Sequence, residues 1–203
     1  GCTHHCYDDF ALLKTLENSQ ITYPATPIEF DSLFRQSYRN DALTVFRVPE
    51  SQHGVSFSSE EIQFGKGIRV ADGNDITLVA TGPQLKTALG ARNILASRGW
   101  DAEILYIHTI RPMDEELIVS SVSKPKHVVV IEEHMRSGGL GDDVLRATRN
   151  LPDVRYASAS IPDEFVREYG SYDDHCEMLG LTPDGVVALV ENEFSRPIRA
   201  SCE

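Results

Sequence analysis

The sequence predicts an α/β fold with three layers, helix, sheet and helix, in which the sheet is mostly parallel. A partial αβαβ piece of a second α/β domain is expected to precede it. One observation is the solid aliphatic run Val128-Val129-Val130-Ile131, which is typical of a strand buried on both faces. The other is that such runs alternate along the chain with apolar residues at helical spacing, which is the pattern of βαβ units.

The first 48 residues are predicted to alternate as helix, strand, helix, strand. Phe10, Leu13 and Leu16 lie at helical spacing, and residues 20–23 form a short strand that ends at Pro24. Residues 26–29 (TPIE) combine a capping threonine, a proline at the first helical position and a glutamate three residues after the cap. A helix is therefore expected to run to about residue 38, followed by a buried strand over residues 43–46.

Residues 49–72 are predicted to form a linker, and residues 73–203 the three-layer domain. The pattern dissolves over residues 49–64 into proline, glycine, serine and glutamate in mixed order. Residues 65–70 and 76–80 look like strands separated by the turn signal Asp72-Gly73-Asn74, so they are expected to pair as a hairpin.

The three-layer domain contains further strands and helices with recognisable start and stop signals. Gly82-Pro83 opens a helix that Gly99 closes with a left-handed cap, and Thr182-Pro183 announces the last helix. The other elements expected, in chain order, are strand 102–107, a short helix around Leu117, strand 128–131 ending at Glu132, a helix opened by Asp142 and Asp143, strand 154–159 and a short helix near Phe165.

Composition and charge limit the functional class. The 203 residues carry a formal net charge of -12, which argues against nucleic acid or an anionic membrane as the main partner. No apolar run approaches the roughly 20 residues of a membrane-spanning helix, and no leader sequence is visible. Four cysteines are too few for a disulfide framework, so a cytoplasmic location is predicted.

The first residues, GCTHHCYDD, are dense in reactive side chains. Cys2, His4, His5 and Cys6 include zinc ligand types, but four adjacent residues cannot easily surround one ion, so no metal site is predicted. Adjacent histidines on a loop suit proton transfer or the binding of a substrate hydroxyl group. From the residue types alone, a solvated loop with incidental histidines remains the competing interpretation.

Residues 137–141 (SGGLG) follow a strand and precede a helix, where a phosphate could bind. The spacing fits neither GxGxxG nor a P-loop, and Asp142 and Asp143 already occupy the positive end of the helix. A tight turn that packs the helix onto the strand is therefore the favoured interpretation. Glu132-Glu133-His134 lies at the carboxyl end of the strand, where α/β proteins bind ligands, but no second carboxylate supports a paired-carboxylate hydrolase.

Several motifs together resemble the transketolase family of thiamine diphosphate enzymes. They cover nearly the whole chain. Residues 109–114 (TIRPMD), 128–145 (VVVIEEHMRSGGLGDDVL) and 181–187 (LTPDGVV) are similar to the family's C-terminal domain. Residues 1–48, with GCTHH and the strand that ends in Val45-Phe46-Arg47, resemble the last third of its pyrimidine-binding domain.

The resemblance implies roles for particular residues. His4 matches the family histidine that faces the thiazolium carbon and handles protons of the substrate hydroxyl, so it is the expected catalytic residue, with His5 assisting in substrate binding. An arginine that grips the substrate phosphate in phosphosugar members corresponds to Glu50 here. Arg47 is expected to compensate as a substrate-binding residue, but the acidic residue puts a phosphorylated substrate in doubt.

The resemblance also implies missing parts. The family's cofactor-activating glutamate lies upstream of the histidine loop, and its Mg²⁺ and diphosphate segment belongs to another domain. This chain alone is therefore expected to bind neither thiamine diphosphate nor Mg²⁺, and to need a diphosphate-binding domain or subunit in a homodimer or heterotetramer.

Three functions stay open at this point. The first is transfer of a two-carbon ketol unit between sugars or related small carbonyl compounds, as in the C-terminal subunits of split transketolases. The second is a portion of a 2-oxo-acid dehydrogenase β subunit, and the third is a non-catalytic docking or regulatory module.

Overall fold

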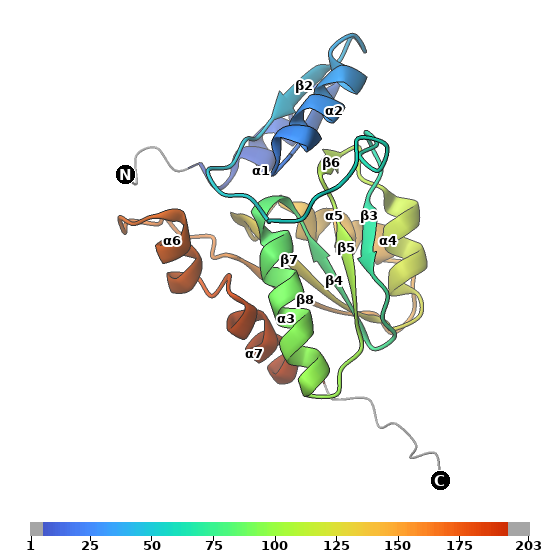
Figure 1. Cartoon of the computed structure of the whole chain (residues 1–203), viewed down its shortest axis with the longest axis vertical. Helices are drawn as coiled ribbons and strands as arrows, with labels where there is room; N and C mark the ends of the chain where they lie inside the picture. Colours follow the sequence, from blue (N-terminus) through green and yellow to red (C-terminus); the bar gives the residue numbers. More distant parts are fainter. Residues whose placement is uncertain (1–5, 195–203) are drawn as a thin grey trace.

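The computed structural model describes residues 6–194, which form two sheets and the helices that cover them (Figure 1). The elements, in chain order, are α1 (Asp9–Lys14), β1 (Ser19–Thr22), α2 (Pro27–Ser37), β2 (Leu43–Phe46), β3 (Ile68–Ala71), β4 (Ile76–Ala80), the 3₁₀ turn η2 (Gly82–Gln84), α3 (Leu85–Ser97), β5 (Ala102–Tyr106), β6 (Thr109–Arg111), α4 (Glu115–Val122), β7 (His127–Met135), α5 (Leu140–Thr148), β8 (Arg155–Ile161), α6 (Tyr172–Met178) and α7 (Pro183–Glu193).

The larger sheet has five strands in the order β3-β5-β4-β7-β8, and all neighbours are parallel except β3, which runs antiparallel to β5. Its central strand β4 is buried along its whole length. Helices α3 and α7 cover one face through Leu85, Leu95 and Val186, and α4 and α5 cover the other through Ile118 and Val144. The predicted three-layer α/β class with a mostly parallel sheet is confirmed.

The smaller sheet has three strands in the order β2-β1-β6. β1 and β2 are parallel, whereas β6, which follows the large sheet's β5 in sequence, pairs with β1 in the antiparallel direction. Phe10 of α1 packs with Ile21, Tyr23 and Ile110 to form a core of its own. The N-terminal elements thus share a strand with the rest of the chain and lie beyond one end of the large sheet (Figure 1).

The division of the chain at residues 48 and 73 stays a prediction, although the structure adds two facts. β3 lies within the stretch expected as a linker, yet it pairs with β5 in the large sheet. The expected hairpin between residues 65–70 and 76–80 is wrong, because β5 lies between β3 and β4. Gly73 packs directly on the backbone of Ala102 and Glu103 in β5. A Cβ atom added to Gly73 would lie 2.2 Å from the carbonyl carbon of Ala102, so only glycine fits at this position.

Three other local expectations are corrected. The short helix expected near Phe165 lies later, at α6, where Ser171 and Asp174 form a reciprocal capping box. The strand expected to end at Glu132 continues as β7 to Met135. Strand β2, expected to be buried, is only half-buried, with Leu43 49% exposed.

The helix starts marked by Thr26 and Thr182 are confirmed. Each threonine hydroxyl accepts a hydrogen bond from the amide three residues ahead, of Glu29 at 3.3 Å and of Gly185 at 3.2 Å. Gly99 has a φ of 81° after α3, as a left-handed cap requires.

The glycine-rich turn after β7 packs helix α5 against the strand, as expected. The buried carboxylate of Glu132 accepts hydrogen bonds from the amides of Leu140 (2.6 Å) and Gly141 (2.9 Å) at the start of α5. A Cβ atom on Gly139 would lie 2.4 Å from Glu132 Oε2, and one on Gly141 would lie 2.2 Å from the Tyr156 hydroxyl. The side chain of Glu132 therefore occupies this helix start and leaves no room for a phosphate.

Within residues 6–194, no helix combines the length and the hydropathy needed to cross a membrane.

Candidate functional site

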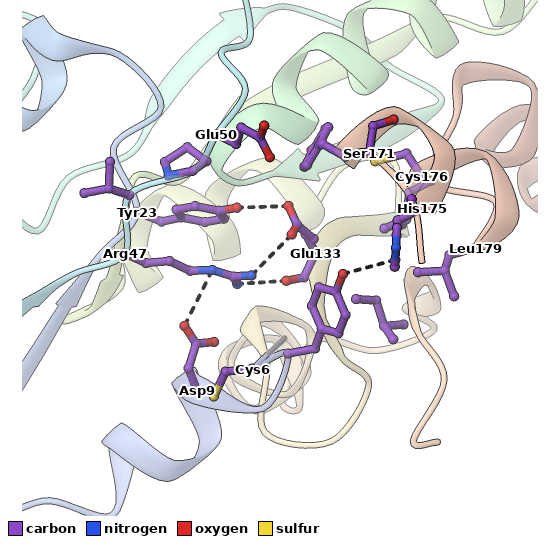
Figure 2. Close-up of a pocket in the computed structure, with 17 residues that line it drawn as sticks. Cys6, Asp9, Tyr23, Arg47, Glu50, Glu133, Ser171, His175, Cys176 and Leu179 are labelled. Atoms are coloured by element: carbon purple, nitrogen blue, oxygen red, sulfur yellow. Dashed lines mark hydrogen bonds and ion pairs between the residues drawn. The ribbon is translucent and has the colours of Figure 1, made fainter. Parts of the chain in front are cut away.

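A cavity of about 340 Å³ lies where the N-terminal elements meet the end of β7 and helix α6 (Figure 2). Its wall is built from separate parts of the chain: the loop before α1 with the first residue of that helix, the residues that follow β1 and β2, Glu133 of β7, Ile161 of β8, and α6 with its flanking residues. This volume lies within the usual range of small-molecule sites.

Arg47, the residue after β2, lines the cavity and contacts Glu133 of β7. Its Nη1 donates to the backbone oxygen of Glu133 at 2.8 Å, and its Nη2 lies 3.5 Å from the Glu133 carboxylate. Its Nε lies 3.5 Å from Asp9 Oδ2. The guanidinium carbon also lies 4.5 Å from the Tyr23 ring centroid and 5.1 Å from that of Phe10, within cation–π range.

The pair of Arg47 and Glu133 is largely removed from solvent, since each side chain is 15% exposed. Burial raises the pKa of Glu133, while Arg47 and the Tyr23 hydroxyl, which donates to Glu133 Oε2 at 3.1 Å, oppose this rise. Burial also raises the pKa of Tyr23 well above its ordinary value. Burial tends to lower the pKa of Arg47, but Tyr23, Asp9 and Glu133 raise it overall, so the arginine stays charged.

Helix α6 supplies the opposite wall. Buried His175 has its Nδ1 3.4 Å from the hydroxyl of Tyr7, and Tyr172 accepts a hydrogen bond from Gln84 Nε2 at 2.8 Å. Burial raises the pKa of the Cys176 thiol, which keeps it protonated and weakens it as a nucleophile. This wall therefore offers hydroxyl and imidazole groups for hydrogen bonding.

Glu50 lies at the cavity where the chain leaves β2, after Val48 and Pro49. Its side chain is exposed, and it makes no hydrogen bond or ion pair with another residue of the described range 6–194. In Figure 2 dashed lines join Arg47 to Glu133 and Asp9, whereas none reaches Glu50. Glu50 thus adds to the cavity a carboxylate that no cation among residues 6–194 pairs with.

The residues expected from the sequence are only partly visible in this arrangement. His4 and His5 lie outside the described residues, but Cys6 and Tyr7, which follow them directly, line the cavity. Arg47 lines it as well. Sequence reasoning missed Tyr172 and His175, and the capping signal Ser171-x-x-Asp174 would have located their helix.

The described residues do not fit the diphosphate and metal part of a thiamine cofactor. Among residues 6–194, no group of three or more His, Cys, Asp or Glu side chains is arranged to hold a metal ion. The start of α5, which could have bound a diphosphate, is filled by Glu132. No chemical step is therefore assigned to such a cofactor on this part of the chain.

Comparison with known proteins identifies the family of the chain. Residues 65–186, more than half of the chain, match the family described as transketolase, C-terminal domain. The chain belongs to the transketolase C-terminal domain family. The match begins just before β3 and ends in α7, so it covers the large sheet, helices α3 to α6 and the start of α7.

Relatives of this transketolase-family chain extend over its N-terminal elements too. A 1-deoxy-D-xylulose-5-phosphate synthase from Syntrophotalea carbinolica is 30% identical over 197 residues, which cover 95% of this chain and 31% of the synthase. A protein provisionally named a transketolase C-terminal section, from Methanocaldococcus jannaschii, is 28% identical over 200 residues, or 97% of this chain and 62% of that protein. The chain thus spans about a third of the synthase and about three fifths of the archaeal relative.

Solved structures agree with the fold. A split-gene transketolase, described as an inactive β4 tetramer, superposes with a TM-score of 0.87 at 28% identity, over 95% of this chain and 63% of that one. A transketolase from Pichia stipitis has a TM-score of 0.72 at 17% identity, over 95% of this chain and 28% of its own, and shows the shared fold alone.

Proposed function

We propose that this chain is the C-terminal portion of a thiamine diphosphate-dependent, transketolase-like enzyme that transfers a two-carbon ketol unit between small carbonyl compounds. The observation that carries the proposal is the cavity between the N-terminal elements and the family's C-terminal domain. Residues from both parts line it, and the split-gene transketolase is similar over both parts.

In this proposal, the chain's own residues bind and orient the substrate and move its protons. His4 takes and returns the proton of the substrate hydroxyl, with His5 as a binding partner; both directly precede the cavity residues Cys6 and Tyr7. Arg47, whose guanidinium is fixed by Glu133 and Asp9, donates a hydrogen bond to a substrate oxygen. A guanidinium held by several contacts is well suited to positioning, because it need not reorganise when substrate enters.

Thiamine diphosphate and Mg²⁺ belong, in this proposal, to a diphosphate-binding domain or subunit of the same enzyme. The N-terminal elements offer a surface for such a partner. β2 is an edge strand of the small sheet. Helix α2 exposes a row of aromatic side chains, which we call the α2 aromatic face. It is made of Phe30, Phe34 and Tyr38, whose side chains are 39%, 44% and 53% exposed. Exposed apolar patches of this kind mark interaction sites. We assign the face to the remaining part of the enzyme, because the chain spans only about a third of the synthase.

The experiment that tests the proposed function compares the complete enzyme with its His4→Ala variant. If His4 moves the substrate proton, kcat for ketol transfer falls by about 10²- to 10⁴-fold. The circular dichroism spectrum and the assembly of the variant stay unchanged, because the substitution removes a reacting group and no core contact.

The matched control is Lys86→Ala, which removes a polar side chain of helix α3 that does not line this cavity. It is expected to leave kcat within about threefold. An unchanged kcat in His4→Ala would contradict the catalytic assignment. Absence of ketol transfer in the complete wild-type enzyme would favour a docking or regulatory module.

A further inference from the structure

The charges around the cavity are unequal. Among residues 6–194, three carboxylates line it, those of Asp9, Glu50 and Glu133, against one guanidinium, that of Arg47. Asp9 and Glu133 both lie 3.5 Å from the guanidinium nitrogens, so the positive charge is already matched inside the wall. Even with Glu133 protonated, Asp9 balances Arg47, and Glu50 leaves the described part of the cavity wall negative.

Glu50 is the carboxylate that an incoming ligand meets. Its side chain is exposed at the cavity and pairs with no other residue of the part of the chain that the structure describes. Asp9 and Glu133, in contrast, are only 21% and 15% exposed and are held by Arg47. A carboxylate without a cation repels a second anion and accepts hydrogen bonds.

The hydrogen-bonding groups of the wall also favour one chemical class. Carboxylates accept hydrogen bonds and cannot donate them, while a phosphate at neutral pH presents mainly acceptors. Hydroxyl groups donate and accept, so a polyol satisfies both the carboxylates and the hydroxyl groups of Tyr7 and Tyr172, which line the same cavity.

We propose that this cavity takes an uncharged, polyhydroxylated carbonyl compound, a free sugar rather than a sugar phosphate, and that Glu50 is the residue that excludes phosphate. The inference rests on the proposed function for the identity of the reaction, but the charge selectivity of the cavity is a property of this chain. The two are therefore tested separately.

The first test measures kcat/KM of the complete enzyme for two matched acceptors, D-ribose and D-ribose 5-phosphate. The wild-type enzyme is expected to prefer the free sugar. Glu50→Arg is expected to shift the ratio of the two kcat/KM values at least tenfold toward the phosphate, and Glu50→Gln by a smaller amount. A wild-type preference for D-ribose 5-phosphate would overturn the inference while leaving ketol transfer itself supported.

The second test needs no turnover. The 203-residue chain is titrated with inorganic phosphate while nuclear magnetic resonance follows the side chains of Tyr7 and Tyr172. No saturable change is expected for the wild type, whereas Glu50→Arg is expected to gain saturable phosphate binding in the cavity. Saturable binding by the wild type, or no gain in Glu50→Arg, would overturn the inference.

Glu116→Arg supplies the matched control. It makes the same change of charge on the exposed face of α4, at a position that does not line the cavity. It is expected to behave as the wild type in both tests. If Glu116→Arg gained the same phosphate binding as Glu50→Arg, net charge would explain the result, and the role of Glu50 would be refuted. Loss of all activity with a clear phosphate titration would fault the proposed reaction alone.

Discussion

At the scale of single residues, two neighbouring carboxylates of β7 have different tasks. Glu132 is fully buried and accepts the amides of Leu140 and Gly141, whereas Glu133 faces the cavity and holds Arg47 and Tyr23. Successive side chains of a strand point to opposite sides, so one motif fixes helix α5 and positions a cavity residue.

The stability of the folded chain should depend on Glu132 through pH. Burial raises its pKa from the ordinary 4.5 to about 7, although the two amides oppose the rise. The folded chain therefore keeps a proton that the unfolded chain has released between these pH values. The stabilising contribution is complete below about pH 4.5 and is lost as pH rises through about 7, by roughly 3 kcal/mol in total.

Urea unfolding at pH 5 and pH 8 tests this expectation. In Glu132→Gln, the difference in unfolding free energy between the two pH values should change by about 2 to 3 kcal/mol relative to the wild type, because the glutamine cannot ionise. Glu116→Gln, an exposed control, should reproduce the wild-type difference. Identical profiles for all three proteins would show that Glu132 does not titrate in this range.

At the scale of elements, helix α1 packs against the end of β7 and the start of α5. Lys14 of α1 donates to the backbone oxygens of Gly138 and Gly139 at 2.8 Å and pairs with Asp143 at 2.6 Å. The His134 ring stacks on Phe10 with a centroid distance of 5.0 Å. These contacts hold α1 and the loop before it against the cavity.

We expect the α2 aromatic face to be required for association with the remaining part of the enzyme. Phe34 lies between Phe30 and Tyr38, with ring centroids 6.0 Å and 5.5 Å away. Phe34→Glu places a charge at the centre of this face and is expected to weaken association with the rest of the enzyme at least tenfold, as measured by sedimentation. Leu145→Glu changes a similarly exposed residue of α5 and should not. Equal affinities of the two variants would rule this face out as the interface.

Sequence reasoning predicted the elements better than their neighbours in space. The buried run 128–131 and the caps at Thr26, Gly99 and Thr182 are local signals, and the structure confirms each. The place of β5 between β3 and β4 is a long-range pairing, which turn residues 72–74 do not encode. The same limit applies to the cavity, where Arg47 meets Glu133 across 86 positions of sequence.

At the scale of the whole molecule, the chain joins a domain of a known family to a smaller N-terminal sheet. Its large sheet belongs to a known domain family, and its small sheet ends at the open edge of β2 beside an exposed aromatic helix face. Within residues 6–194, the cavity is lined by Asp9, Glu50, Glu133 and Arg47, and no cluster of side chains is arranged to hold a metal ion. This combination fits an enzyme whose cofactor is bound by a different part.

Isothermal titration calorimetry with thiamine diphosphate and Mg²⁺ decides whether the cofactor is bound by another part of the enzyme. No tight binding is expected for the 203-residue chain alone. Stoichiometric binding, together with ketol transfer, is expected once the chain is combined with the diphosphate-binding part of the enzyme. Tight stoichiometric binding of the cofactor by the isolated chain would refute the proposed division of the site.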